Sequence, residues 1–187
     1  MVTLTDIDII QLLRKNSLNQ DTLQDDVVAK LRALGLKVAT AESCTGGLIS
    51  ERITRVSGSS EVFDCGVCSY GNAIKTKVLG VREDTLSILG AVSAETAIQM
   101  AEGVKKLSGA DIAVSTTGIA GPTGGTAEKP VGLVFMGVCT KDNAYAVKLT
   151  LGGVNAQNSR AYIRKLASDA ALFTVLSECY NLQRGTA

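Results

Sequence analysis

The chain has 187 residues, of which 45% are apolar and 20% charged, so it is long enough for one globular domain with a sizeable core. Nineteen basic and eighteen acidic residues leave a net charge of +1, which excludes the strongly basic surface typical of proteins that bind nucleic acid or anionic membranes. No apolar run is long enough to cross a bilayer, and the N-terminus lacks the order of a signal peptide. We therefore expect a cytoplasmic protein with neither nucleic acid nor membrane as a partner.

The cysteines predict reduced thiols rather than a disulfide framework, because their number is odd and they are scattered along the chain. They are Cys44, Cys65, Cys68, Cys139 and Cys179. The segment 65–68 has the Cys-x-x-Cys spacing of redox motifs, but it lies in a strand-like run and not at the start of a helix. A zinc site would lack ligands, because the chain has no second such motif and no histidine. No metal or other cofactor is expected.

The first half of the chain alternates between helical and strand-like patterns. Apolar spacing predicts a short helix over residues 3–15, with Thr5 as its N-terminal cap, and a polar link follows. The next expected elements are a helix at 23–34 ended by Gly35, a strand at 36–41, a helix at 46–56, a turn at 57–60 and a strand ending near Tyr70.

Strands cluster in the second half. The expected elements there are helices at 75–79 and 93–107, strands at 111–117, 131–140 and 145–151, and a long final helix at 158–176. Ser93 is the expected cap of the second of these helices. The whole pattern is typical of an α/β layer fold in which helices cover both faces of one sheet.

Three segments rich in small polar residues each follow a predicted strand, at 42–47, 70–75 and 116–132. Ligand sites in open α/β sheets gather beyond the carboxyl ends of the strands, so these three segments are expected to share one pocket.

The first of these segments reads Ala-Glu-Ser-Cys-Thr-Gly-Gly and offers the side chains of Ser43, Cys44 and Thr45. A strand that runs through a Gly-Gly turn into a helix places backbone amides near a helix N-terminus, where they favour a phosphate or a developing oxyanion. Ser43 and Thr45 are also typical helix caps, so the segment alone does not decide between chemistry and structure. Because the chain has no histidine, any base that activates a nucleophile here must be another residue type.

The second segment, Tyr-Gly-Asn-Ala-Ile-Lys, holds Tyr70, Asn72 and Lys75. A lysine acts as a base when burial or nearby positive charge keeps it neutral, and a tyrosine hydroxyl can relay a proton. A solvated lysine and a packed tyrosine are the structural alternative. The third segment is a long glycine-rich loop stiffened by the only two prolines of the chain, Pro122 and Pro130, and such loops let ligands approach main-chain amides.

Two further features carry a weaker signal. Ser59 and Ser60, in the sequence Gly-Ser-Ser-Glu-Val-Phe, are also typical of a plain turn. Arg160 and Arg164 lie one helical turn apart and suit a planar or phosphate anion, although such arginines are more often surface charges.

Four of these motifs, in this order, resemble the CinA C-terminal domain family, which includes stand-alone nicotinamide-nucleotide amidohydrolases of the PncC type. The motifs are TAESCTGG, GSS before a phenylalanine, Tyr-x-Asn-x-x-Lys, and GIAGPTGGT with the following KPVG, and the resemblance covers roughly residues 24–177. It divides the chain into an N-terminal helical extension at 1–22 and a CinA-like domain at 23–180.

The resemblance implies a three-layer α/β/α sandwich with a mixed sheet that hydrolyses the carboxamide of nicotinamide mononucleotide (NMN). The products would be ammonia and nicotinate mononucleotide, formed in pyridine-nucleotide salvage through a seryl acyl-enzyme without a cofactor. It also implies a homo-oligomer, most simply a dimer.

The motifs assign roles to particular residues of this chain. By resemblance Ser60 is the nucleophile and Tyr70 and Lys75 activate it, with Ser43 as the second candidate for the nucleophile. The implied substrate-binding residues are Ser43, Cys44, Thr45, Gly46, Asn72, Thr117, Gly118, Gly121, Gly124 and Arg160. Ten extended residues would hold Ser60 roughly 33 Å from Tyr70, so the assignment requires residues 61–64 to be coiled or helical.

The chain departs from the family pattern at Gly71, Ala73, Ile74 and Ser159, where acidic or other residues are common, and these departures bear on substrate affinity. A catalytically inactive nucleotide-binding or regulatory domain is the alternative to the enzyme. A redox protein based on Cys44 or on the Cys-x-x-Cys motif is a third possibility.

Overall fold

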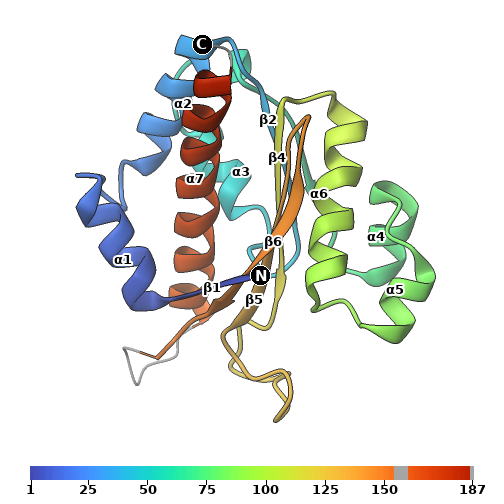
Figure 1. Ribbon diagram of the computed structural model, residues 1–187. Helices are drawn as coiled ribbons and strands as arrows, with labels where there is room; N and C mark the ends of the chain where they lie inside the picture. The colour runs from blue at the N-terminus through green and yellow to red at the C-terminus, as the bar shows by residue number, and fades with distance from the viewer. Residues whose placement is uncertain (154–159, 186–187) are drawn as a thin grey trace.

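The computed structural model describes residues 1–153 and 160–185, and it forms a mixed six-stranded sheet with helices on both faces (Figure 1). The strand order is β1-β6-β5-β4-β2-β3. Strands β2 (Val38–Glu42), β3 (Phe63–Cys68) and β4 (Ile112–Gly118) are parallel, whereas β5 (Leu133–Cys139) is antiparallel to both β4 and β6 (Ala144–Thr150). The three-layer α/β/α class expected from the sequence is confirmed.

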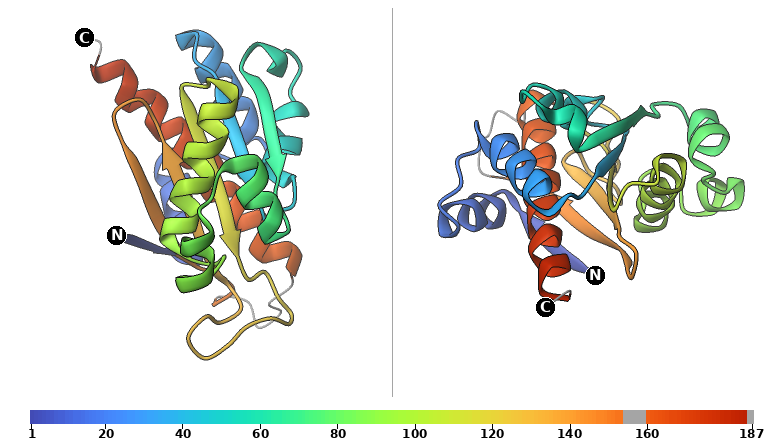
Figure 2. Two further views of the ribbon diagram at one scale, coloured as in Figure 1. Left: turned by 90° about the vertical axis from the view of Figure 1, so that its right-hand side faces the viewer. Right: turned by 90° about the horizontal axis from the view of Figure 1, so that it is seen from above.

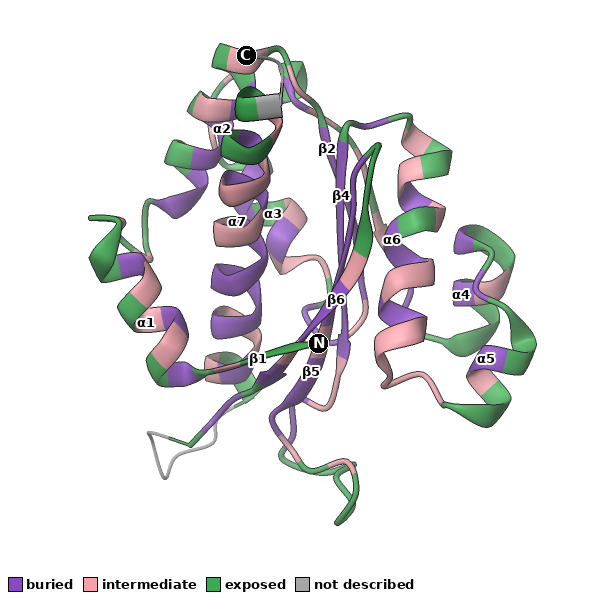
Figure 3. Ribbon diagram, viewed as in Figure 1, coloured by how far each residue is buried: buried purple, intermediate pink, exposed green. Residues whose placement is uncertain are grey.

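The helices on one face of the sheet enclose the larger of the two clusters of buried apolar residues. They are α2 (Leu23–Leu34), α3 (Leu48–Thr54) and the long helix α7 (Arg160–Gly185), with α1 (Asp6–Lys15) at their side (Figures 1 and 2). Figure 3 shows that the middle turns of α7 are buried, whereas its end near the C-terminus is exposed. Helix α2 begins and ends where its sequence pattern predicts, because Gly35 adopts the left-handed conformation that ends it.

The other layer contains α4 (Asn72–Leu79), α5 (Glu83–Ile88) and α6 (Ala94–Ser108), and α6 lies directly on the sheet. The predicted cap Ser93 accepts a hydrogen bond from the amide of Thr96, which fixes the start of α6. The short helix α5 has no counterpart among the predicted elements, since six residues give too little periodicity to detect.

The N-terminus differs from the predicted single helix over residues 3–15. Residues Val2–Thr5 form strand β1, which pairs in parallel with β6, and the helix begins only at Asp6. Thr5 is the predicted cap, and its side chain and that of Asp8 satisfy each other's backbone amides in a capping box. The predicted start of the final helix at residues 158–159 lies outside the described residues, as does Ser159.

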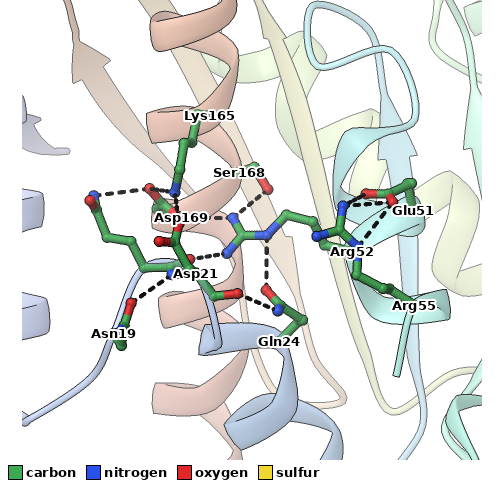
Figure 4. Close-up of polar contacts among 10 residues, drawn as sticks. Asn19, Asp21, Gln24, Glu51, Arg52, Arg55, Lys165, Ser168 and Asp169 are labelled. Atoms are coloured by element: carbon green, nitrogen blue, oxygen red, sulfur yellow. Dashed lines mark hydrogen bonds and ion pairs between the residues drawn. The ribbon is translucent and has the colours of Figure 1, made fainter. Parts of the chain in front are cut away.

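A buried charge network joins α3 to α7 (Figure 4). The Arg52 guanidinium donates to the Asp169 carboxylate at 2.7 Å, and the side chains are 7% and 0% exposed. Arg52 also donates to Ser168, Gln24 and the Gln20 carbonyl, so each side of its guanidinium is satisfied. Burial raises the pKa of Asp169, and the opposing charges of Arg52 and Lys165 offset part of that rise. The network therefore holds α3, which follows the segment 42–47, against α7.

Candidate active site

The three small-residue segments meet at the carboxyl edge of the parallel strands, as expected. Glu42, the last residue of β2, lies opposite Cys68 of β3 and Thr116 of β4. The residues that follow these positions line a cavity of about 210 Å³. Its walls are formed by Ser43, Cys44, Tyr70, Asn72, Lys75, Ala91, Val92, Thr117, Gly118, Ala120 and Arg160.

Lys75 and Ser43 form the central contact of this cavity. The Lys75 side chain is buried, with 1% of the residue exposed, and its Nζ lies 3.1 Å from Ser43 Oγ. The same nitrogen donates to the Ser69 carbonyl at 2.7 Å and contacts the Tyr70 carbonyl at 3.4 Å. The two carbonyl oxygens thus accept two of the hydrogens on Nζ, and the remaining direction around this nitrogen points to the serine hydroxyl.

Burial lowers the pKa of Lys75 from its ordinary value of 10.5, and the nearby thiols of Cys44 and Cys68 oppose part of this shift. No carboxylate forms an ion pair with Lys75 in the described part of the chain. A neutral amine beside a serine hydroxyl is the arrangement a lysine base requires.

The start of α3 is occupied by the protein's own carboxylate. Glu42 is fully buried and accepts hydrogen bonds from the amides of Gly47, Ile49 and Ser50. These amides are therefore not available to a substrate anion. The amides of Cys44 and Thr45 differ, because they lie against the Cys44 thiol and not against a carboxylate.

Cys44 lines the cavity but is a poor nucleophile. Its side chain is buried, and this burial raises the pKa of its thiol to about 12. At neutral pH the thiol therefore stays protonated. All five cysteines are free, and successive side chains of β3 point to opposite faces, so Cys65 and Cys68 do not form a redox pair.

Thr45 and Gly46, both expected to bind substrate, do not line the cavity. The Thr45 side chain is fully buried and shares a hydrogen bond of 2.7 Å with Thr116. Arg164 donates to the Thr45 carbonyl from α7 at 3.1 Å, a contact that the spacing of Arg160 and Arg164 did not predict. The two arginines thus serve different places, since Arg160 lines the cavity and Arg164 holds the turn behind it.

The Tyr70 hydroxyl lies against Arg160 and not against the serine. Arg160 donates to this hydroxyl at 2.8 Å and to the Gly121 carbonyl at 3.0 Å. Tyr70 is 64% exposed, and only its backbone carbonyl reaches Lys75. The structure therefore places Tyr70 at the mouth of the cavity, with no hydrogen bond that would relay a proton between Ser43 and Lys75.

Ser60 lies at the other end of strand β3, away from the cavity. It belongs to a short 3-10 helix, Ser59–Glu61, that precedes β3, whereas Tyr70 and Lys75 follow β3. The six residues of β3 are extended, and five steps of about 3.3 Å separate the two ends by roughly 16 Å. The assignment of Ser60 required residues 61–64 to be coiled or helical. This holds only as far as Val62, because Phe63 and Asp64 already belong to strand β3. Ser60 is exposed there and does not line the cavity.

The three glycines of the glycine-rich loop that were expected to bind substrate lie in different places. Gly118 lines the cavity, Gly121 accepts from Arg160, and Gly124 lies outside. Thr117 donates to the Ala91 carbonyl at 2.7 Å and so fixes the segment with Ala91 and Val92, two lining residues that the sequence motifs did not indicate. Of the family departures, Ala73 and Ile74 are exposed on α4 and do not line the cavity.

A larger cavity of about 640 Å³ lies at the other edge of the sheet, among Leu34, Asp111, Asn143 and Glu178. Its lining holds no serine or cysteine, so the smaller cavity is the better candidate for catalysis. Among the described residues, no group of three or more histidine, cysteine or acidic side chains is arranged to hold a metal ion. Nor does that part of the chain contain a helix long and apolar enough to cross a membrane.

The protein is an α/β/α domain whose cavity, at the carboxyl ends of the parallel strands, contains a serine hydroxyl beside a buried lysine amine. The chain belongs to the CinA C-terminal domain family, whose model matches residues 20–179.

Named relatives agree with this placement. A putative competence-damage inducible protein of Thermoanaerobacter sp. (strain X514) is 53% identical over 137 residues, which are 73% of this chain and 33% of that protein. A CinA-like protein of Kosmotoga olearia is 54% identical over 134 residues, 72% of this chain and 32% of that protein. The chain thus spans about a third of the length of these relatives.

Solved structures share the fold. A competence/damage inducible protein from Agrobacterium tumefaciens gives a TM-score of 0.80 at 42% identity, over 84% of this chain and 94% of that one. A CinA superfamily protein from Klebsiella pneumoniae 700603 gives a TM-score of 0.81 at 29% identity, over 87% of this chain and 99% of that one.

Proposed function

We propose that this protein is an amidohydrolase that deamidates NMN to nicotinate mononucleotide and ammonia, with Ser43 as its nucleophile. The observation that carries the proposal is the 3.1 Å contact between the buried Lys75 amine and the Ser43 hydroxyl. Ser60, the residue first assigned this role, lies at the far edge of the sheet, so the role passes to the second candidate.

In the first half-reaction, neutral Lys75 takes the proton of Ser43 as the serine oxygen attacks the carboxamide carbon. The carbonyl oxygen becomes an oxyanion, for which main-chain amides of the turn at 43–45 are the expected donors. When this intermediate collapses, the carbon–nitrogen bond breaks and the Lys75 ammonium gives its proton to the leaving nitrogen. Ammonia departs and the acyl group stays on Ser43.

In the second half-reaction, Lys75 takes a proton from water, and the resulting hydroxide attacks the acyl carbon. The ester bond breaks, Ser43 recovers its proton from Lys75, and the carboxylic acid leaves. No step in this sequence requires a cofactor.

Arg160 supports a substrate that carries an anionic group. Its guanidinium contacts two neutral oxygens, of Tyr70 and Gly121, and within the described residues no carboxylate pairs with it. An arginine with an uncompensated charge at a cavity mouth suits a phosphate. The cavity of about 210 Å³ accommodates the carboxamide end, and the phosphate then lies toward Arg160 and solvent.

The test is the release of ammonia and nicotinate mononucleotide from NMN by the purified protein. Nicotinamide and nicotinamide riboside, which carry the same carboxamide without the phosphate, serve as matched substrates. We expect turnover of NMN that survives chelation by EDTA, and much weaker turnover of the two phosphate-free compounds. Binding of NMN without any ammonia release would instead support the nucleotide-binding or regulatory alternative.

A further inference from the structure

The N-terminal residues before position 20 lie outside the matched family model, yet they are packed onto the segment that carries Arg160. Strand β1 extends the sheet beside β6, with Thr5 opposite Thr150 at the end of that strand. Helix α1 then turns back along α7 (Figure 1). The connection between β6 and α7 therefore leaves the sheet next to the start of α1.

Asp6, the first residue of α1, holds both ends of that connection. Its carboxylate is buried, with 1% of the residue exposed, and both oxygens accept from the Gly152 amide, at 2.9 and 3.0 Å. One of the same oxygens lies 3.4 Å from the Tyr162 hydroxyl. Gly152 stands two residues after β6, and Tyr162 lies on the first turn of α7.

The residue presented by this first turn is Arg160. Tyr162 is only two positions further along the helix, so Asp6 holds this turn from one side while Arg160 reaches Tyr70 and Gly121 on the other. Burial, together with the charge of Asp6, raises the pKa of Tyr162, so its hydroxyl stays protonated and donates to the carboxylate.

We propose that Asp6 is a positioning residue that orients Arg160 toward the substrate, and that the N-terminal strand and helix are thereby part of the working site. Its effect on turnover rests on the proposed function, but its effect on the start of α7 does not. A buried carboxylate that accepts a charge-assisted hydrogen bond from one main-chain amide and another from a tyrosine hydroxyl fixes both segments more firmly than surface packing does.

The experiment compares Asp6→Ala, Asp6→Asn and Asp8→Ala in the full chain. Asp8 is the matched control, because its carboxylate completes the capping box of the same helix but contacts neither Gly152 nor Tyr162. Hydrogen exchange of peptides covering the first three turns of α7 measures the positional effect without reference to activity. Asp6→Ala should speed exchange there, Asp8→Ala should leave it unchanged, and Asp6→Asn should fall between them, because one carbonyl oxygen can still accept from Gly152.

Kinetics with NMN measure the consequence for the site. Asp6→Ala should raise KM roughly tenfold, the effect expected from losing hydrogen bonds to a charged group, and should change kcat little. In an Arg160→Ala background, the same substitution should have no further effect on KM, because its target is gone.

Equal exchange at the start of α7 in Asp6→Ala and Asp8→Ala would overturn the proposal. So would an additive effect of Asp6→Ala and Arg160→Ala on KM. If Asp6→Ala does not fold, Asp6→Asn against Asp8→Ala decides in the same two measurements. A wild-type protein that releases no ammonia would refute the proposed function alone, and the exchange result would still decide the role of Asp6.

Discussion

The amine of Lys75 lies 3.1 Å from the hydroxyl of Ser43, although 32 positions separate the two residues in the chain. Ser43 follows β2, and Lys75 lies on the helix after β3, the next strand of the sheet. Parallel pairing of these strands is what brings the two side chains to one edge.

The activity should rise with pH through the ionisation of Lys75. Burial lowers its pKa below 10.5, and only the neutral amine can take the Ser43 proton, so kcat/KM should increase and level off before pH 10.5. Lys75→Arg keeps the charge but supplies no base at these pH values, and should lose roughly 10²- to 10⁴-fold in kcat. A flat profile together with an active Lys75→Arg variant would show that Lys75 supplies only positive charge.

The same pKa shift should make stability depend on pH. The unfolded chain binds the lysine proton more tightly than the folded one, so the free energy of unfolding should rise with pH. The cost of the buried charge is fully present below the folded pKa and fades between that value and 10.5. Urea unfolding of the wild type and of Lys75→Met across this range measures the effect, since titrations that the two proteins share cancel in the difference. A difference that stays constant would contradict the lowered pKa.

Cys44 should be dispensable for the chemistry although it lines the cavity. Its pKa of about 12 leaves almost no thiolate at neutral pH, so Cys44→Ala should keep kcat within a few-fold of the wild type. The control is Ser43→Ala, one residue away in the same turn. Loss of turnover in Cys44→Ala with an unchanged melting temperature would instead make the thiol a participant.

Arg52 of α3 and Arg55, the residue that follows this helix, should contribute very differently to stability (Figure 4). Removing Arg52 leaves the buried Asp169 charge without its main partner, so Arg52→Ala should cost about 3–5 kcal/mol in the free energy of unfolding. Arg55 forms an exposed pair with Glu51, whose side chains are 62% and 52% exposed, and Arg55→Ala should cost about 0.5 kcal/mol or less. Chemical denaturation of both variants makes the comparison. Equal costs would mean that the buried network adds nothing to an ordinary surface pair.

Local sequence signals predicted much of the fold because they act over a few residues. Gly35 ends α2 and Ser93 caps α6 through contacts within one turn, and both positions were expected. The sequence pattern predicts a helix where strand β1 lies, because only the pairing of β1 with β6, more than 140 residues away, makes this segment a strand.

The site shows the same division. The convergence of the three loops follows from the order of strands and loops, and it predicts that Ser43 and Lys75 lie near one pocket. The site roles of Thr117 and Arg160 come from the resemblance to the family. The start of β3 was not evident from the sequence, and that start decides on which edge of the sheet Ser60 lies. The contacts of Asp6 with Gly152 and of Arg164 with Thr45 join distant segments, and no spacing along the chain indicates them.

The most direct test of the account is the turnover of NMN by Ser43→Ala and Ser60→Ala, measured beside the wild type as ammonia release. Ser43→Ala should lose activity to the limit of detection, because no other hydroxyl of the described residues contacts the Lys75 amine. Ser60→Ala should stay close to the wild type, because its exposed side chain lies at the opposite edge of the sheet. An inactive Ser60→Ala beside an active Ser43→Ala, with both proteins folded, would contradict the central claim.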